Sequence, residues 1–152
     1  MPFFIDTSPP GQCIFCRLVS HELPSAIVFE DEQTLAFMDL GQVNPGHVLV
    51  ASKRHAATLL DLSAEEAAAV MRTAHGVAGA IATTFDPPGL ILLQANGKEG
   101  EQTVFHFHMH VVPRHAGDGI ALTWPRKDPA RPLLENYAQQ LRQAMAQSDK
   151  NQ

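Results

Sequence analysis

Basic residues are scarce in this chain of 152 residues: 11 Lys and Arg stand against 16 Asp and Glu, and the formal net charge is −5. Without a basic field nothing holds the phosphate backbone of a nucleic acid, so we expect no nucleic-acid partner, although a single nucleotide needs only a few local donors. Long apolar runs are also missing, and the N-terminus lacks the basic start and apolar core of a signal peptide. We therefore expect a cytoplasmic protein without a membrane partner.

Cysteine is equally rare, since the chain contains only Cys13 and Cys16. The two form a C-x-x-C. In a reducing compartment this spacing indicates metal binding or redox chemistry before a structural disulfide.

The chain length suits one domain, which we place over 1–152, with an irregular arm over 1–12, a core over 13–114 and a tail over 115–152. No internal repeat is visible. Apolar spacing, turn residues and a Ser63–Glu66 capping-box pattern predict the elements in this order: a short helix or turn at 13–20, a hairpin of strands at 26–31 and 34–40, a turn at 44–46 followed by a strand, a long helix from 63 to 85, strands at 90–95 and 104–112, and a C-terminal helix at 133–145. This order predicts an α+β fold with an antiparallel sheet of about five strands.

The segment VFHFHMHVV, residues 104–112, places His106, His108 and His110 at every second position. Written as a strand, it puts all three imidazoles on one face and apolar side chains on the other. The histidines could have no role, could bind one metal together, or could divide different tasks. Adjacent same-face residues are roughly 6.5–7 Å apart, so two imidazoles converge on a metal far more easily than three, and a division of tasks is favoured.

Several further motifs accompany the histidines. CIFC, LAFMD, NPGHVLV, KRH and QTVFHFHMHVVPR follow one another between residues 13 and 114. In this order and spacing the chain resembles the histidine triad (HIT) family, whose signature is His-φ-His-φ-His-φ-φ, where φ is apolar. The resemblance implies a HIT-like α+β fold, a homodimer, and a nucleotide-binding hydrolase or transferase that attacks the α-phosphate.

The resemblance also implies separate roles for the histidines of the site. His108 would be the nucleophile and form a nucleotidyl-histidine that water hydrolyses, because neutral imidazole suits attack near pH 7. His110 would donate a hydrogen bond to the phosphate or the leaving group, and His47 would assist proton relay. An acceptor behind His108 must fix its tautomer so that the attacking nitrogen keeps a lone pair.

The nucleotide itself would be held by residues from several segments. The resemblance gives Asp39 the ribose hydroxyls. Gln102 and Thr103, directly before the histidines, offer neutral donors to phosphate. Candidates to sandwich the base are Ile27, Phe29, Phe37 and Leu40. Many family members have an asparagine that touches phosphate where this chain has Ala95, and the next residue, Asn96, is a nucleotide-binding candidate even though side-chain alternation points it to the other face.

Zinc-bearing members of the family use a C-x-x-C, the histidine of the K-x-H segment and the first triad histidine. These positions are Cys13, Cys16, His55 and His106, a Cys₂His₂ set of the kind that closes a structural zinc site. Redox cycling and two unpaired buried thiols are the alternatives.

The leading hypothesis is a hydrolase that releases a nucleoside monophosphate from purine nucleotide substrates, either phosphoramidates or aminoacyl adenylates. Dinucleoside polyphosphate hydrolysis is the alternative within the same chemistry. From other classes, the alternatives are a non-catalytic zinc-stabilised nucleotide-binding scaffold and a metalloenzyme that uses the H-x-H-x-H segment directly.

Overall fold

The computed structural model describes residues 4–149, which divide into one compact unit through Asp118 and a second from Gly119. The second unit contains one helix, and the elements of the first unit carry the candidate site. In chain order the elements are α1 (Ile14–Val19), β1 (Ile27–Glu30), β2 (Thr34–Met38), β3 (Val48–Ser52), the 3-10 turn η1 (Leu59–Asp61), α2 (Ala64–Phe85), β4 (Gly89–Leu93), the 3-10 turn η2 (Lys98–Gly100), β5 (His108–Arg114) and α3 (Arg131–Ser148).

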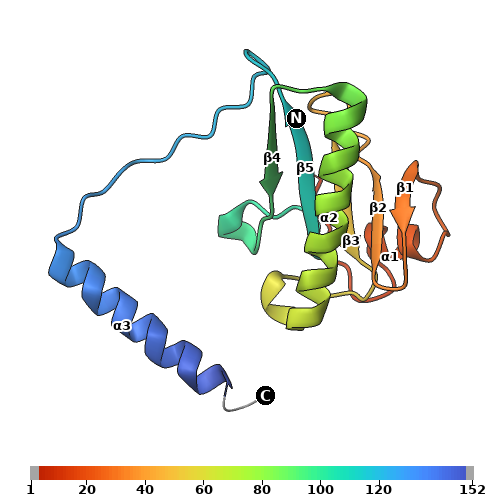
Figure 1. Ribbon diagram of the computed structural model, residues 1–152. Helices are drawn as coiled ribbons and strands as arrows, with labels where there is room; N and C mark the ends of the chain where they lie inside the picture. Colours follow the sequence, from red (N-terminus) through yellow and green to blue (C-terminus); the bar gives the residue numbers. More distant parts are fainter. Residues whose placement is uncertain (1–3, 150–152) are drawn as a thin grey trace. The chain divides into compact units, whose positions relative to one another are not determined.

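The five strands form one sheet in the order β1-β2-β3-β5-β4, and every neighbouring pair is antiparallel (Figure 1). This confirms the predicted α+β fold, and the predicted hairpin, long helix and later strands are all present. The sheet brings β5 between β3 and β4, so His108 and His110 lie inside the sheet and not at its edge.

The long helix α2 lies across one face of the sheet (Figure 1). Its capping box is formed: the Ser63 hydroxyl accepts from the Glu66 N–H at 3.2 Å, and the Glu66 carboxylate accepts from the Ser63 N–H at 2.8 Å. A hydrogen bond from Arg54 lowers the pKa of Glu66 to about 2. Buried apolar residues of α2 pack on the sheet in a cluster of Ala36, Val48, Val50, Val70, Ala74, Val77, Ile81, Phe107 and Val111.

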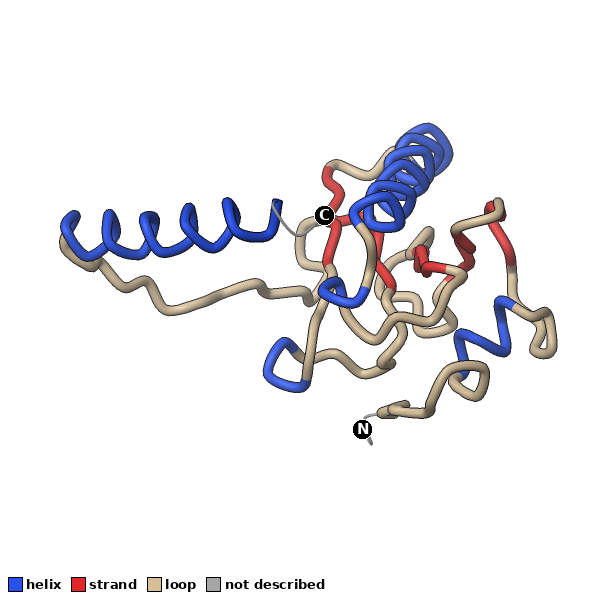
Figure 2. Tube along the Cα trace, turned by 90° about the horizontal axis from the view of Figure 1, so that it is seen from below, coloured by secondary structure: helices blue, strands red, loops and turns tan. Residues whose placement is uncertain are grey.

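The opposite face of the sheet packs against the short helix α1 and the loops around it (Figure 2). Its cluster consists of Cys13, Phe15, Leu18, Leu35, Phe37, Leu49, Ala51 and Val104. In the β3–β5 register His110 is paired with Leu49 and His108 with Ala51. Paired residues point to the same face of a sheet, so both histidines lie on the α1 face.

The prediction of one strand over 104–112 is wrong at its start, because β5 begins at His108. The preceding backbone has other partners: Phe105 N–H donates to the Asp6 carbonyl at 2.8 Å, and Phe107 N–H donates to the Ala56 carbonyl at 2.7 Å. The N-terminal arm and the loop after β3 therefore replace the sheet ladder there. As a result His106 precedes the strand that carries His108 and His110.

The second unit is described by α3 alone, which is longer at both ends than the predicted helix at 133–145. Pro132 lies in its first turn, where a missing N–H costs nothing. Between residues 4 and 149, no helix is both long and apolar enough to span a bilayer.

The predicted turn before β3 depends on Gly46. Its φ is +100°, and a Cβ placed there would lie 2.8 Å and 2.9 Å from ring atoms of Phe85 and 3.3 Å from Pro113. Glycine tolerates this backbone conformation and other residues rarely do. The turn thus lies against the end of α2 and positions His47 directly after it.

We expect Gly46→Ala to lower the free energy of unfolding by about 1–3 kcal/mol, because the new methyl group overlaps the Phe85 ring and the positive φ becomes strained. Urea denaturation measures the change. Gly79→Ala in α2 is the matched control, since its Cβ meets no atom within 4 Å; it should leave stability unchanged or raise it by up to about 1 kcal/mol. Equal effects of the two substitutions would contradict the steric argument.

Candidate active site

A pocket of about 240 Å³ opens on the α1 face of the sheet. Six residues that the sequence analysis selected line it: Phe37, Asp39, Leu40, Thr103, His108 and His110. The remaining lining is mostly apolar and comes from the arm, α1 and the strands: Phe4, Ile14, Phe15, Leu18, Pro24, Ser25, Ala26, Met38, Leu49 and Val104. Two imidazoles and one carboxylate therefore face a cavity whose other walls are mostly apolar, apart from the hydroxyl residues Ser25 and Thr103.

His108 is held in one tautomer. Its side chain is buried, and its Nδ1 lies 2.7 Å from the carbonyl oxygen of His106, which only accepts. Nδ1 therefore carries the hydrogen, and Nε2 keeps a lone pair. The ring also packs edge-on against Phe15, with centroids 4.8 Å apart. Burial lowers the pKa of His108, so the ring is neutral at pH 7.

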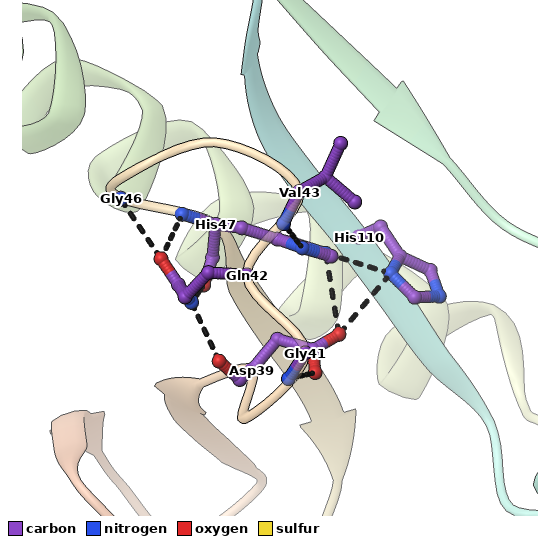
Figure 3. Close-up of polar contacts among 7 residues, drawn as sticks. All are labelled: Asp39, Gly41, Gln42, Val43, Gly46, His47 and His110. Atoms are coloured by element: carbon purple, nitrogen blue, oxygen red, sulfur yellow. Dashed lines mark hydrogen bonds and ion pairs between the residues drawn. The ribbon is translucent and has the colours of Figure 1, made fainter. Parts of the chain in front are cut away.

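His110, His47 and Asp39 form a polar group (Figure 3). It lies next to His108, because the centroids of the His108 and His110 rings are 5.2 Å apart. His47 Nε2 lies 2.9 Å from His110 Nδ1 and 3.4 Å from Asp39 Oδ2. Burial lowers the pKa of His47 and lowers that of His110 to about 4, with a smaller effect from the neighbouring histidines on His110. Both rings are therefore neutral at pH 7 despite the nearby carboxylate.

The hydrogen positions in this group follow from one backbone donor. Val43 N–H donates to His47 Nδ1 at 3.4 Å, so His47 carries its hydrogen on Nε2. That hydrogen points at His110 Nδ1, which must accept. His110 consequently carries its own hydrogen on Nε2, and the pocket has one imidazole with a lone pair and one with an N–H donor.

The candidate metal ligands Cys13, Cys16, His55 and His106 lie in one cluster next to the pocket. Their sulfur-to-Nδ1 distances are 3.3 and 3.5 Å for His106 and 3.6 and 3.3 Å for His55. A tetrahedral zinc with bonds of about 2.3 Å to sulfur and about 2.05 Å to nitrogen separates such ligands by about 3.5 Å, so the donor set fits this ion. His106 Nε2–H donates to the Ser52 carbonyl at 2.6 Å, which leaves Nδ1 free to bind.

The three triad histidines do not converge on one point. His106 faces the cysteines, whereas His110 belongs to the group with Asp39 and His47. This separation disfavours one metal shared by all three rings.

Gln102 and Asn96 are placed differently from what the sequence suggested. The Gln102 amide is buried, donates to the carbonyls of Ala57 at 2.6 Å and Val104 at 3.1 Å, and accepts from Gly97 N–H at 2.8 Å. Both of its donor hydrogens are thus committed to the backbone. Asn96 is exposed, and its amide bonds Leu59 N–H and Gln94. Neither residue lines the pocket.

The apolar candidates also need correction. Ile27 and Phe29 do not line the pocket, because the hairpin register shifts between them and β1 is the outer strand of the sheet. Phe29 faces a hollow beside α2 instead. Ile14, Phe15 and Leu18 of α1 take their place. The sequence contained a signal for this role of α1, because four of its six side chains are apolar and one buried face needs fewer.

Gln42 was not singled out from the sequence. Its side-chain amide makes four hydrogen bonds within the loop that carries Asp39 and His47 (Figure 3). A lone glutamine between Gly41 and Val43 has no spacing pattern that would reveal this role.

The HIT domain family model matches residues 20–117, a stretch that contains all five strands and α2. The chain belongs to the HIT domain family. It is 39% identical to "Protein hit" of Bacillus subtilis over 139 residues, which is 90% of this chain and 96% of that protein. It is also similar to the crystal structure of a HIT family protein from Bacillus anthracis, with a TM-score of 0.86 and 34% identity over 90% of this chain and 99% of that one.

Two further HIT relatives have informative names. Adenosine 5'-monophosphoramidase hnt1 of Schizosaccharomyces pombe is 35% identical over 114 residues, covering 74% of this chain and 83% of that protein. A zinc-bound histidine triad family protein from Mycobacterium smegmatis has a TM-score of 0.69 and 34% identity over 95% of this chain and all of that one.

Acid should destabilise this HIT domain partly through His110. Its pKa is about 4 in the folded state against about 6.5 when unfolded, so between these values the unfolded chain binds more protons. The free energy of unfolding should fall as the pH drops from 6.5 to 4, and His110 should contribute on the order of 2–3 kcal/mol to that fall. Chemical denaturation of the wild type and His110→Asn across this range tests the expectation, and parallel pH curves would refute it.

Proposed function

We propose that this HIT protein hydrolyses purine nucleotide derivatives at the α-phosphate through a nucleotidyl-histidine on His108, and releases a nucleoside monophosphate. The observation that carries the proposal is the 2.7 Å bond from His108 Nδ1 to the His106 carbonyl, because it leaves a neutral, buried Nε2 with a lone pair beside a pocket.

The reaction proceeds in two steps. His108 Nε2 attacks the phosphorus, and the bond to the leaving group breaks as its electron pair departs with that group. His110 Nε2–H supplies the proton that an amine or alkoxide leaving group needs. A water molecule then attacks the phosphorus, and the phosphorus–nitrogen bond breaks as its electron pair returns to His108 Nε2. One proton of that water goes back to His110 Nε2, and the nucleoside monophosphate is freed.

The pocket suggests where the nucleotide lies. The base would sit between apolar side chains of α1 and the sheet, among them Phe15 and Phe37, whose rings already contact each other edge-on at 5.4 Å. Asp39 Oδ1 accepts from Gly41 N–H, while its Oδ2 faces the histidines, and we assign Asp39 to the ribose hydroxyls. Of the neutral phosphate donors that the sequence predicted, Thr103 lines the pocket and Gln102 does not. We give Ile27, Phe29, Gln102 and Asn96 no direct contact.

Phosphoramidates and aminoacyl adenylates are the substrates that we favour, because the hnt1 relative is a monophosphoramidase and because His110 offers a proton to the leaving group. Dinucleoside polyphosphates remain the alternative within the same chemistry. A scaffold that binds a nucleotide without turnover is the alternative from another class, and the tautomer of His108 argues against it, since binding alone does not require a nucleophile.

We infer that the cysteine cluster binds a structural zinc ion through Cys13, Cys16, His55 and His106. The ligand distances fit the ion, and the zinc-bound relative supports the assignment. Burial raises the pKa of the Cys13 thiol to about 11, so the Cys13 sulfur becomes a ligand only when a cation stabilises its charge. The ion would tie the segment before α1 to the loop after β3.

We also infer a cytoplasmic homodimer. The outer strand β4 exposes Leu90, Leu92 and Leu93 by 37–48% each. An exposed apolar edge strand is normally covered, and a two-fold pairing of this edge would cover it.

His108→Ala should reduce turnover of an adenosine phosphoramidate by more than about 10³-fold, because the nucleophile is lost. AMP affinity should change little, since the apolar pocket and Asp39 stay in place. AMP release followed by chromatography and AMP binding followed by calorimetry separate the two effects. His75→Ala, on the exposed side of α2, is the control and should retain full activity. Full turnover by His108→Ala would refute the assignment.

Purified protein should contain about one zinc per chain, and Cys16→Ser should reduce this content, because it removes one of four ligands. Elemental analysis measures the metal, and thermal unfolding with and without a chelator measures its effect on stability. His108→Ala should keep its zinc. A metal-free wild type whose unfolding is indifferent to chelators would overturn the zinc inference.

A further inference from the structure

The loop of residues 39–47 carries both Asp39 and His47, and one side chain closes it. Gln42 Oε1 accepts from the backbone N–H groups of Gly46 at 3.0 Å and His47 at 3.1 Å. Gln42 Nε2 donates to the carbonyls of Asp39 and His47, both at 2.6 Å (Figure 3). The Gln42 side-chain nitrogen and oxygen therefore both bond to backbone groups at the two ends of the loop, near Asp39 and near His47.

This arrangement fixes the backbone of Asp39, which lines the pocket, and of His47, which contacts the pocket residue His110. His47 is held at both its N–H and its carbonyl, and Asp39 at its carbonyl. Gln42 also directly precedes Val43, whose N–H donates to His47 Nδ1. The bond from Val43 is long, at 3.4 Å, and it exists only while the loop keeps Val43 and the His47 ring in this relation.

The consequence reaches His110 through one chain of hydrogen bonds. Val43 N–H places the His47 hydrogen on Nε2, that hydrogen is given to His110 Nδ1, and His110 then keeps its hydrogen on Nε2. If Val43 moved away, His47 could carry its hydrogen on either nitrogen. The hydrogen of His110 would then no longer be fixed on Nε2, the nitrogen that donates in the pocket.

We propose that Gln42 is a positioning residue that sets the tautomer of His110, and so selects for substrates whose leaving group must be protonated. The inference rests on the proposed function for its catalytic consequence. The tautomer itself is a property of the resting protein and is measured separately.

Leaving-group dependence distinguishes this role from a merely structural one. Loss of general-acid assistance lowers the reaction rate by about 10²–10⁴-fold. The rate falls by less when only part of the molecules carry the His110 hydrogen on the wrong nitrogen. We expect Gln42→Met to slow the release of an amine from an adenosine phosphoramidate by about 10- to 100-fold. Release of p-nitrophenolate from the p-nitrophenyl ester of AMP should change less than about 3-fold, because this group leaves without a proton.

The experiment measures leaving-group release in single turnover for the wild type, Gln42→Met, Gln42→Glu and the control Gln33→Met, which lies at the exposed tip between β1 and β2. Gln42→Glu keeps the acceptor for Gly46 and His47 but turns a charged oxygen toward the carbonyls of Asp39 and His47 in place of the donor, so it should slow amine release at least as much as Gln42→Met. Long-range proton–nitrogen NMR of labelled protein reports the tautomer directly: Nε2–H on His110 in the wild type and a mixture in Gln42→Met.

A wild type with its His110 hydrogen on Nδ1 would overturn the inference, even if neither Gln42 variant folds. So would equal slowing of both substrates, or an unchanged tautomer in Gln42→Met. If the wild type turns over neither substrate, the proposed function fails, while the tautomer measurement still decides the inference.

Discussion

The hydrogen bond between His108 and the carbonyl of His106 joins the two halves of the site. The carbonyl belongs to a residue whose ring faces the cysteine cluster, and the imidazole belongs to the pocket. A single residue therefore presents its side chain to one centre and its backbone to the other. Any force that rotates the His106 peptide changes both the metal ligands and the tautomer of His108.

Alternation along the histidine segment makes this division possible, although the strand itself begins only at His108. The backbone bonds of Phe105 and Phe107 to the arm and to Ala56 hold the segment extended before it enters the sheet. His106 is thereby turned toward α1 and the loop after β3. His110, in contrast, projects from a regular strand and meets His47, which directly precedes the neighbouring strand β3.

The elements of the fold were largely predictable from local patterns. Turn residues between apolar segments marked the hairpin of β1 and β2, an apolar run marked β3, a capping box marked the start of α2, and Asn-Pro-Gly marked the turn at Gly46. The candidate metal ligands were also selected from spacing and resemblance. These signals are local in sequence or consist of rare residue types, so a single sequence displays them. Zinc binding itself, and the roles of the histidines, remain predictions.

The apolar lining and the loop closure were not predictable in the same way. Phe15 and Phe29 have the same chemistry, and only the tertiary path of the chain places one in the pocket and the other beside α2. Gln102 looked like a free donor because sequence does not show which carbonyls compete for its hydrogens. The role of Gln42 could not be predicted either, because its partners are backbone groups, which are present at every position of the sequence.

Two walls of the pocket, Ile14 and Phe15, are the two residues between Cys13 and Cys16. The same four residues, 13–16, therefore determine both the shape of the cavity and the spacing of the two cysteine ligands. A substitution of Ile14 or Phe15 that enlarges the cavity for a bulkier base therefore also changes the segment that holds Cys13 and Cys16 in the candidate metal site.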